Sequence, residues 1–422
     1  MSEADLDLEL DAPAVMLPAG ARDVLPAEAD ALRAVEADLR ATMDSFGYRE
    51  VITPVLELAE VMDRAEEGGL GRSFRLFDDH GRVMVLRPDL TIPVARLVAT
   101  RFSAHPGPIR VRYTGRRFRP SPVGRPEPVE ERQAGFELVG ASGPEADAEV
   151  VAVLVHALRR AGLDEVRVSV GDVELCREVL EALEVPMDAR RVLASALAGR
   201  NLVAWRRAVS GLDLPLAEST LLVELPSLRG GTEILERIRE VAPNAAGSCD
   251  WLERAFALAE AHGVRAALNL DFGVLRDWSY YSGVVFEAYV EGESMPLAVG
   301  GRYDGLGERF GRGRTAVGVA IALGPLHRAI AARRGADTPL RFGVVLCGGL
   351  DTELALATTI RATGTPVIGA ALDAERAEQL AAEDGWRFVA SHTPSGIELF
   401  DRDSGTRHSA SDLMSALAKA RA

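Results

Sequence analysis

Residues 275–287 combine one arginine, a pair of tyrosines and an apolar run that is typical of a β-strand. Gly300 and Gly301 follow after a short interval and predict a double-glycine turn. A guanidinium group such as that of Arg276 is a forked hydrogen-bond donor for carboxylates. Tyr280 and Tyr281 would supply an apolar wall with hydroxyl tips. Together, these residues predict a pocket for a small molecule that carries a carboxylate.

The composition limits what the chain can do. It has 422 residues, of which 47% are hydrophobic, enough to bury one large core and a smaller second one. The formal net charge of −15 argues against a nucleic-acid partner, because phosphate binding depends on clustered lysines and arginines. The three cysteines, Cys176, Cys249 and Cys347, are widely separated and indicate a reduced setting rather than a disulfide framework.

Residues 1–16 are acidic, and we expect them to be disordered. An acidic start is the opposite of the basic start of a signal peptide. No apolar run is long enough to span a bilayer. We therefore expect a cytoplasmic protein with no membrane contact.

Helical and strand patterns alternate through residues 17–335, which we expect to form one core domain. Within it, residues 181–262 are rich in alanine and leucine and predict a helical insertion. After a linker-like stretch, strands and helices alternate again through residues 336–422. This last region predicts a small α/β domain.

Residues 133–139 alternate between apolar positions and polar or small ones. The two-residue period of a strand places Gln133 and Glu137 on one face, on either side of Gly135 and roughly 13 Å apart. These two side chains would straddle a small zwitterion, one meeting an ammonium group and the other an imidazole N–H. Taken alone, the pattern is more typical of a strand with a solvated polar face.

Asp89 lies in a proline-stiffened loop, and Thr91 stands where a helical pattern begins. One interpretation is an ordinary helix start, at which the Asp89 carboxylate accepts hydrogen bonds from backbone N–H groups. In the other, Asp89 pairs with the ammonium group of a ligand, because a buried charge requires a partner. Both interpretations stay open at this point.

The order of these segments resembles that of class II aminoacyl-tRNA synthetases of the histidyl type, over about residues 17–330. The resemblance implies an α+β fold with an antiparallel sheet of six or seven strands flanked by helices, in a dimer to whose interface residues 47–54 contribute. The C-terminal domain would be a reduced anticodon-binding domain. From residue 341 on it has 11 acidic and 8 basic residues, which favours a remnant or packing module over an RNA reader. By position, the residues that would hold histidine are Asp89, Thr91, Gln133, Glu137, Arg276, Tyr280 and Tyr281.

Departures from the synthetase pattern argue against catalysis. Ser121 stands where motif 2 would have an acid, and Pro325 stands where motif 3 would have an arginine against the nucleotide. Positive groups placed in advance stabilise phosphoryl-centred transition states, and the loss of one such group costs about 3–4 kcal/mol. Arg119 would be a remnant of the nucleotide site. We expect no catalytic residues, no metal and no cofactor.

Residues 276–289 also resemble those of the regulatory subunits of ATP phosphoribosyltransferase, which are synthetase paralogues in histidine biosynthesis. This resemblance implies a non-catalytic subunit that supports a short-form catalytic subunit and confers feedback inhibition by histidine. The implied partners are that catalytic subunit, histidine as effector, and a second copy of the chain within a hetero-oligomer, with no tRNA. The alternatives are a divergent histidyl-tRNA synthetase and a free-standing histidine sensor.

Overall fold

The computed structural model describes residues 17–65, 73–120, 128–275, 280–334, 340–348, 350–393, 396–409 and 417. The chain divides into two compact units, residues 1–332 and 333–422. The lead that we expect to be disordered, residues 1–16, lies outside the described residues, as does Arg276. Within the described ranges, no helix is long and apolar enough to cross a membrane.

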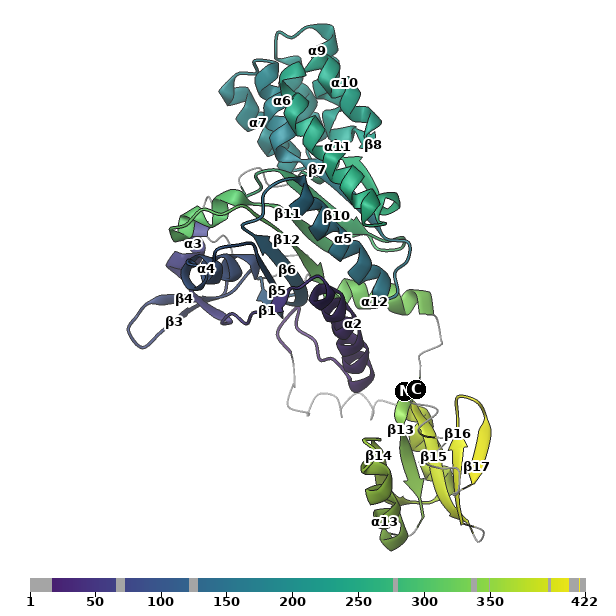
Figure 1. The fold of residues 1–422 in the computed structure, drawn as a ribbon. Coiled ribbons are helices and arrows are strands. Elements are labelled where there is room, and N and C mark those ends of the chain that lie inside the picture. The colour runs from purple at the N-terminus through teal and green to yellow at the C-terminus, as the bar shows by residue number, and fades with distance from the viewer. Residues whose placement is uncertain are drawn as a thin grey trace, which may run out of the picture. The chain divides into compact units, whose positions relative to one another are not determined.

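A mixed nine-stranded sheet forms the centre of the first unit (Figure 1). In spatial order its strands are β1 (Arg49–Glu50), β5 (Ile109–Phe118), β6 (Glu130–Val139), β12 (Ala316–Ala322), β11 (Ala298–Arg302), β10 (Val284–Tyr289), β7 (Arg167–Asp172), β9 (Leu268–Asp271) and β8 (Arg229–Gly230). The strands from β5 to β7 are antiparallel to one another, whereas β1 and β9 join them in parallel. The expected antiparallel sheet is present, but the prediction of six or seven strands was too low. The sequence patterns predict neither β7 nor β11, and β8 is too short to give a period-two signal.

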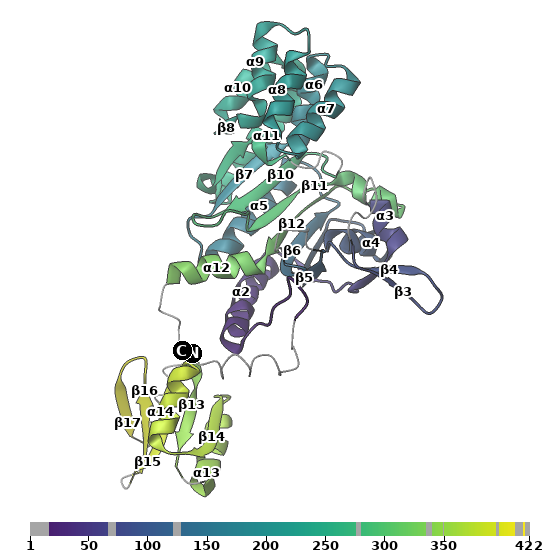
Figure 2. The ribbon, with the colours of Figure 1, turned by 180° about the vertical axis from the view of Figure 1, so that it is seen from behind.

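Helices cover both faces of this sheet (Figures 1 and 2). On one face, α2 (Pro26–Ser45), α5 (Pro144–Arg160) and α12 (Leu323–Arg334) share a core with apolar side chains of the strands. On the other face, α3 (Ala59–Ala65) and α4 (Thr91–Arg101) share a second core with β5 and with β4 (Val83–Leu86). A small sheet of β2 (Leu56–Leu58), β4 (Val83–Leu86) and β3 (Arg75–Phe77) adjoins that second core. The two cores define an α5 face and an α4 face of the central sheet.

The prediction of a double-glycine turn was wrong. Gly300 and Gly301 lie inside β11 and pair with β10 on one side and β12 on the other. A Cβ at Gly300 would overlap the Phe286 ring, and one at Gly301 would overlap the Tyr281 ring. The two glycines therefore allow aromatic rings to approach the sheet closely, instead of reversing the chain.

The helical insertion contains six α-helices and the short strand β8, at one end of the sheet in Figure 1. Its first helix begins at Val173, before the expected bound at residue 181. The helices are α6 (Val173–Ala182), α7 (Met187–Ala198), α8 (Leu202–Ser210), α9 (Leu216–Glu224), α10 (Glu233–Val241) and α11 (Ala246–Ala261). Trp205 is fully buried among them and donates from Nε1 to the carbonyl oxygen of Leu222 at 2.7 Å. Because α11 packs along α5, the insertion shares the core of the α5 face.

The second unit contains a five-stranded sheet. Its strands follow the order β14 (Val367–Leu372), β13 (Arg341–Cys347), β15 (Trp386–Thr393), β16 (Gly396–Asp401) and β17 (Thr406–Ser409). β13 is parallel to β14 and β15, and helices α13 (Leu350–Arg361) and α14 (Ala374–Glu383) connect these parallel strands. The prediction of a small α/β domain is therefore confirmed. Residues 410–422 lie outside the described residues, apart from Leu417.

Candidate ligand site

Glu137 forms the centre of the candidate site. It lies on β6 and, as the two-residue period predicts, shares one face of the strand with Gln133, whereas Ala134 and Phe136 enter the core of the α5 face. Both side chains are buried, and Glu137 is only 1% exposed. The alternative interpretation of this face as solvated was wrong.

Two tyrosines hold the Glu137 carboxyl group on the α4 face. Tyr113 donates a hydrogen bond to Oε1 at 3.2 Å, and Tyr303 donates one to Oε2. Gly318 lies directly opposite Glu137 across the β6–β12 pair, and a Cβ at this position would overlap Oε2. Only glycine therefore leaves room for the carboxyl group in its observed position.

The row of residues across the sheet continues this glycine floor. Gly318 pairs with Gly301 of β11, so two successive positions beside Glu137 lack a side chain. The ring of Tyr281 occupies the space over Gly301. The floor between Glu137 and the tyrosine wall is thus formed by backbone alone.

Burial raises the pKa of Glu137 to about 8. The charge of Asp89 adds to this increase, while hydrogen bonds from Tyr303, Thr91 and Tyr113 oppose it. Burial also raises the pKa of both tyrosines well above the usual range, with the charge of Glu137 as the next cause. At neutral pH the carboxyl group is therefore mostly protonated and the hydroxyls are neutral, so these groups can both donate and accept hydrogen bonds.

Asp89 and Thr91 lie where α4 begins. Asp89 accepts a hydrogen bond from the backbone N–H of Ile92 at 2.9 Å, as the interpretation of a helix start predicts. The charge of the same carboxylate raises the pKa of Glu137 and of Tyr280, which places it at the edge of the site. The helix-start and ligand-site interpretations are therefore compatible.

Tyr280 and Tyr281 form the aromatic wall that the sequence predicts. Their rings pack edge to face with centroids 4.9 Å apart, and Tyr280 stacks on Tyr303 at 5.6 Å. Burial raises the pKa of Tyr280, with the charge of Asp89 as the next cause. Arg276 belongs to the segment just before this wall, outside the described residues, so its contact with a ligand carboxylate stays a prediction.

Gln133 and Arg119 lie toward the charged end of the β5–β6 hairpin. Gln133 donates from Nε2 to Oε2 of Glu131 at 3.1 Å. Arg119 is exposed and donates from Nε to the carbonyl oxygen of Pro88 at 2.9 Å. The structure thus places Arg119 beside the loop that carries Asp89, and Gln133 on the same face of β6 as Glu137.

Three residues of the site were not predicted from the sequence: Tyr113, Tyr303 and Gly318. Tyr303 follows the glycine pair that was interpreted as a turn, so its strand context went unrecognised. Tyr113 faces Glu137 because β5 and β6 are neighbours, and the hydrogen-bond register of this pair is visible only in the structure. An alternation count along residues 109–118 would have placed Tyr113 on one face but not beside Glu137.

Comparison with known proteins first defines the class. A family model described as histidyl-tRNA synthetase matches residues 20–326. The histidyl-tRNA synthetase of Nostoc sp. PCC 7120 has the same fold, with a TM-score of 0.83 at 19% identity over 96% of this chain and 99% of that chain. A protein from Bacillus halodurans, described as an ATP phosphoribosyltransferase regulatory subunit/histidyl-tRNA synthetase, has a TM-score of 0.78 at 28% identity over 90% of this chain and 98% of that chain. The fold is therefore that of histidyl-tRNA synthetase-like class II proteins.

Curated relatives then define the family. The ATP phosphoribosyltransferase regulatory subunit of Moorella thermoacetica is 39% identical over 375 residues, which cover 87% of this chain and 95% of the relative. That of Symbiobacterium thermophilum is 38% identical over 393 residues, which cover 90% of this chain and 97% of the relative. This chain belongs to the family of ATP phosphoribosyltransferase regulatory subunits, so the resemblance drawn from its sequence is confirmed. Its role is that of a regulatory subunit rather than of a catalyst.

Proposed function

We propose that this regulatory subunit binds free histidine at Glu137 and confers histidine feedback inhibition on a short-form catalytic subunit of ATP phosphoribosyltransferase. The observation that carries the proposal is the buried Glu137 carboxyl group, which Tyr113 and Tyr303 hold over a glycine floor. Such a group is a fitting partner for an imidazole N–H, because a buried acceptor makes a strong hydrogen bond in the absence of competing water.

Each polar group of histidine has a matching residue in the proposed site. The imidazole ring would meet Glu137, with the tyrosine wall against its apolar edges. The ammonium group would meet Asp89 at the start of α4, with Thr91 and Gln133 as further acceptors. The carboxylate would meet Arg276. This arrangement leaves no ligand charge buried without a partner.

The proposed binding would not lead to activation of histidine. Adenylation requires positive groups that are available to the α-phosphate of ATP. In the β5–β6 hairpin, Arg116 instead pairs with Glu130 at 2.7 Å, and Arg117 pairs with Glu131. Pro325 occupies the first turn of α12, where motif 3 would have its arginine. These features favour recognition of the amino acid without transfer.

The proposed assembly contains two copies of this chain together with catalytic subunits, in the cytoplasm and without tRNA. Support for the homodimer comes from several exposed apolar side chains on and beside the three-stranded sheet. Ile52 and Phe77 are the most exposed members, at 84% and 73%. Isolated apolar side chains are normal at a surface, whereas a group of them indicates an interface. Val55, Leu56 and Leu76 are exposed as well, and the register of β2, β4 and β3 places Leu56 and Leu76 on one face of the small sheet. Histidine would then act by binding one state of the assembly more tightly than another.

Calorimetric titration of the purified chain with histidine tests the binding site. We expect saturable binding of histidine but not of glutamine, and about a tenfold or greater loss of affinity in Glu137→Ala, since a buried imidazole N–H left without its acceptor costs about 1–3 kcal/mol. Glu149→Ala is the matched control, because this carboxylate also accepts from a tyrosine, Tyr48 at 3.1 Å, but on the α5 side of the molecule. Unchanged affinity in Glu137→Ala would place the site elsewhere.

Two assays separate the alternative functions. Histidine-dependent exchange of pyrophosphate into ATP at enzymatic rates would overturn the regulatory proposal in favour of a synthetase. Reconstitution with a short-form catalytic subunit tests the partner: we expect a stable complex whose phosphoribosyltransferase activity histidine inhibits. A chain that binds histidine but forms no such complex would be a free-standing sensor.

A further inference from the structure

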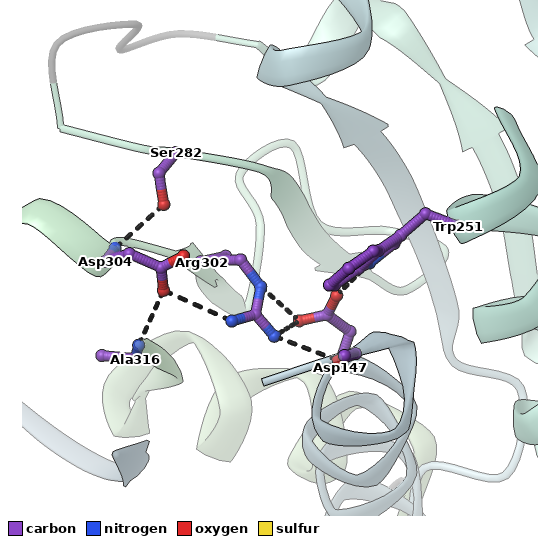
Figure 3. A network of polar contacts seen from close by, with 7 residues as sticks. Asp147, Trp251, Ser282, Arg302, Asp304 and Ala316 are labelled. Carbon is purple, nitrogen blue, oxygen red and sulfur yellow. Dashed lines mark hydrogen bonds and ion pairs between the residues drawn. The ribbon is translucent and has the colours of Figure 1, made fainter. Parts of the chain in front are cut away.

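Arg302, the last residue of β11, lies in a buried network of polar contacts (Figure 3). Its guanidinium group donates to Oδ1 of Asp147 from Nη2 at 2.6 Å and from Nε at 3.1 Å. Trp251 donates from Nε1 to the other carboxylate oxygen of Asp147 at 2.7 Å, and its ring centroid lies 5.5 Å from the guanidinium carbon. Asp147 is on α5 and Trp251 on α11, so the network joins the central sheet to the helical insertion.

The peptide bond between Arg302 and Tyr303 connects this network to the opposite face of the sheet. The side chain of Arg302 lies on the α5 face, where it meets Asp147. The next residue, Tyr303, lies in the core of the α4 face and donates to Glu137. The two side chains therefore extend from adjacent residues to opposite faces, and the Arg302 contacts fix the backbone that positions the Tyr303 hydroxyl.

Ser282, the residue after the aromatic wall of Tyr280 and Tyr281, forms hydrogen bonds with the backbone of Arg302 and Asp304. The N–H of Asp304 donates to Oγ of Ser282 at 2.9 Å (Figure 3). The N–H of Ser282 donates to the carbonyl oxygen of Arg302 at 2.8 Å. From the insertion, Arg177 on α6 donates to the carbonyl oxygen of Tyr281 at 3.3 Å. Both sides of the proposed histidine pocket are thus connected to the helical insertion.

We propose that the ion pair between Arg302 and Asp147 transmits occupancy of the Glu137 pocket to the helical insertion, where Trp251 responds. This inference rests on the proposed binding of histidine. A ligand that shifts Tyr303 also shifts the backbone of Arg302, and a buried ion pair resists separation because each charge would lose its partner. Asp147 and Trp251 therefore move together with Arg302. Arg302 is a positioning residue, and by reciprocity a perturbed insertion changes the affinity for histidine.

Fluorine NMR of the full chain labelled with 5-fluorotryptophan tests this path. The four tryptophans give four signals, and Trp251→Phe identifies one of them. We expect saturating histidine to shift the Trp251 signal, while the signal of Trp386 in the second unit stays in place. Calorimetry on the same sample measures binding. Histidine that binds without moving the Trp251 signal would overturn this inference alone, whereas absence of binding would overturn the proposed function as well.

Variants test whether the ion pair carries the effect. In Asp147→Asn we expect the Trp251 shift to disappear and the histidine affinity to change at least fivefold. Arg302→Lys keeps the positive charge but loses the forked guanidinium group that contacts Asp147 and Asp304 together. We therefore expect this variant to lose the Trp251 shift and to change the histidine affinity as well. The matched control is Glu253→Gln, which removes an α11 carboxylate that pairs with Arg239 at 2.7 Å, away from the network.

A shift that persists in Asp147→Asn would overturn the inference. Should Asp147→Asn fail to fold, Trp251→Phe gives a second measurement, because it keeps an aromatic ring and removes only the donor to Asp147. An affinity for histidine that stays within twofold of the wild-type value in this variant would equally overturn it.

Discussion

Replacement of Glu137 by glutamine should change how the stability of the protein depends on pH. Burial raises the pKa of this carboxyl group from its ordinary value near 4.5 to about 8. Between these two values the folded chain binds one proton more than the unfolded chain. The contribution of Glu137 to the free energy of unfolding is therefore fully present below about pH 4.5 and is lost as the pH rises through about 8.

The size of the effect follows from the same two values. Where only the folded chain is protonated, the free energy of unfolding falls by about 1.4 kcal/mol per pH unit. The loss between pH 6 and pH 8 amounts to about 2 kcal/mol, because the slope flattens as the folded carboxyl ionises. Glutamine has nearly the same shape and cannot ionise. Asp172, whose pKa burial raises to about 7, titrates in both proteins and cancels in their difference.

Urea denaturation of the ligand-free wild-type and Glu137→Gln proteins at pH 6, 7 and 8 measures this difference. The wild type should lose about 2 kcal/mol more than the variant across this range. Parallel curves for the two proteins would refute the reasoning, since they would mean that burial does not keep the carboxyl group protonated in the folded state.

Three further predictions concern the site and the homodimer. Gly318→Ala should displace the buried carboxyl group, weaken histidine binding at least tenfold and lower the free energy of unfolding by about 1–3 kcal/mol. In Gly305→Ala the added Cβ meets nothing within 4 Å, so neither the histidine affinity in calorimetry nor the free energy of unfolding in denaturation should change. Equal effects of the two variants would contradict the overlap between a Cβ at Gly318 and the Glu137 carboxyl group. Tyr303→Phe should move the pH-dependent loss of stability to higher pH, because the hydrogen bond it removes lowers the pKa of the carboxyl group. An unchanged pH profile would speak against that bond. Phe77→Asp should produce monomers in sedimentation velocity, whereas Leu216→Asp, at an exposed position on the insertion, should not; a dimer that survives Phe77→Asp would place the interface elsewhere.

Alternation along a strand was enough to predict which residues of β6 share a face with Glu137. Burial acts on every second residue, so the face shared by Gln133 and Glu137 can be deduced from residues 133–139 alone. The partners across the sheet cannot be deduced in this way. Gly318 lies opposite Glu137 because β12 pairs with β6, and the register of strands so distant in the sequence is set by tertiary packing.

The error at Gly300 and Gly301 has a related cause. A glycine pair is compatible with a turn and with close approach inside a sheet, and local sequence does not distinguish them. The deciding contacts are the rings of Phe286 and Tyr281, which reach the glycines only in the folded chain. For the same reason, the sequence did not indicate that Arg302 reaches α5 and α11.

The structure around Glu137 is unfavourable for folding alone, and this argues for a ligand. The buried carboxyl group weakens the fold as the pH rises, and the glycine opposite it contributes no side chain to the sheet. A chain that needed only a stable sheet would carry apolar, β-branched residues at both positions. On the β5–β6 hairpin, by contrast, the charged groups have partners: Arg116 and Arg117 form ion pairs with carboxylates at the surface of the folded chain. A subunit that recognises an amino acid but does not join it to a nucleotide needs this combination: a buried acceptor such as Glu137 that lowers the stability of the fold, and arginines that are already paired with carboxylates.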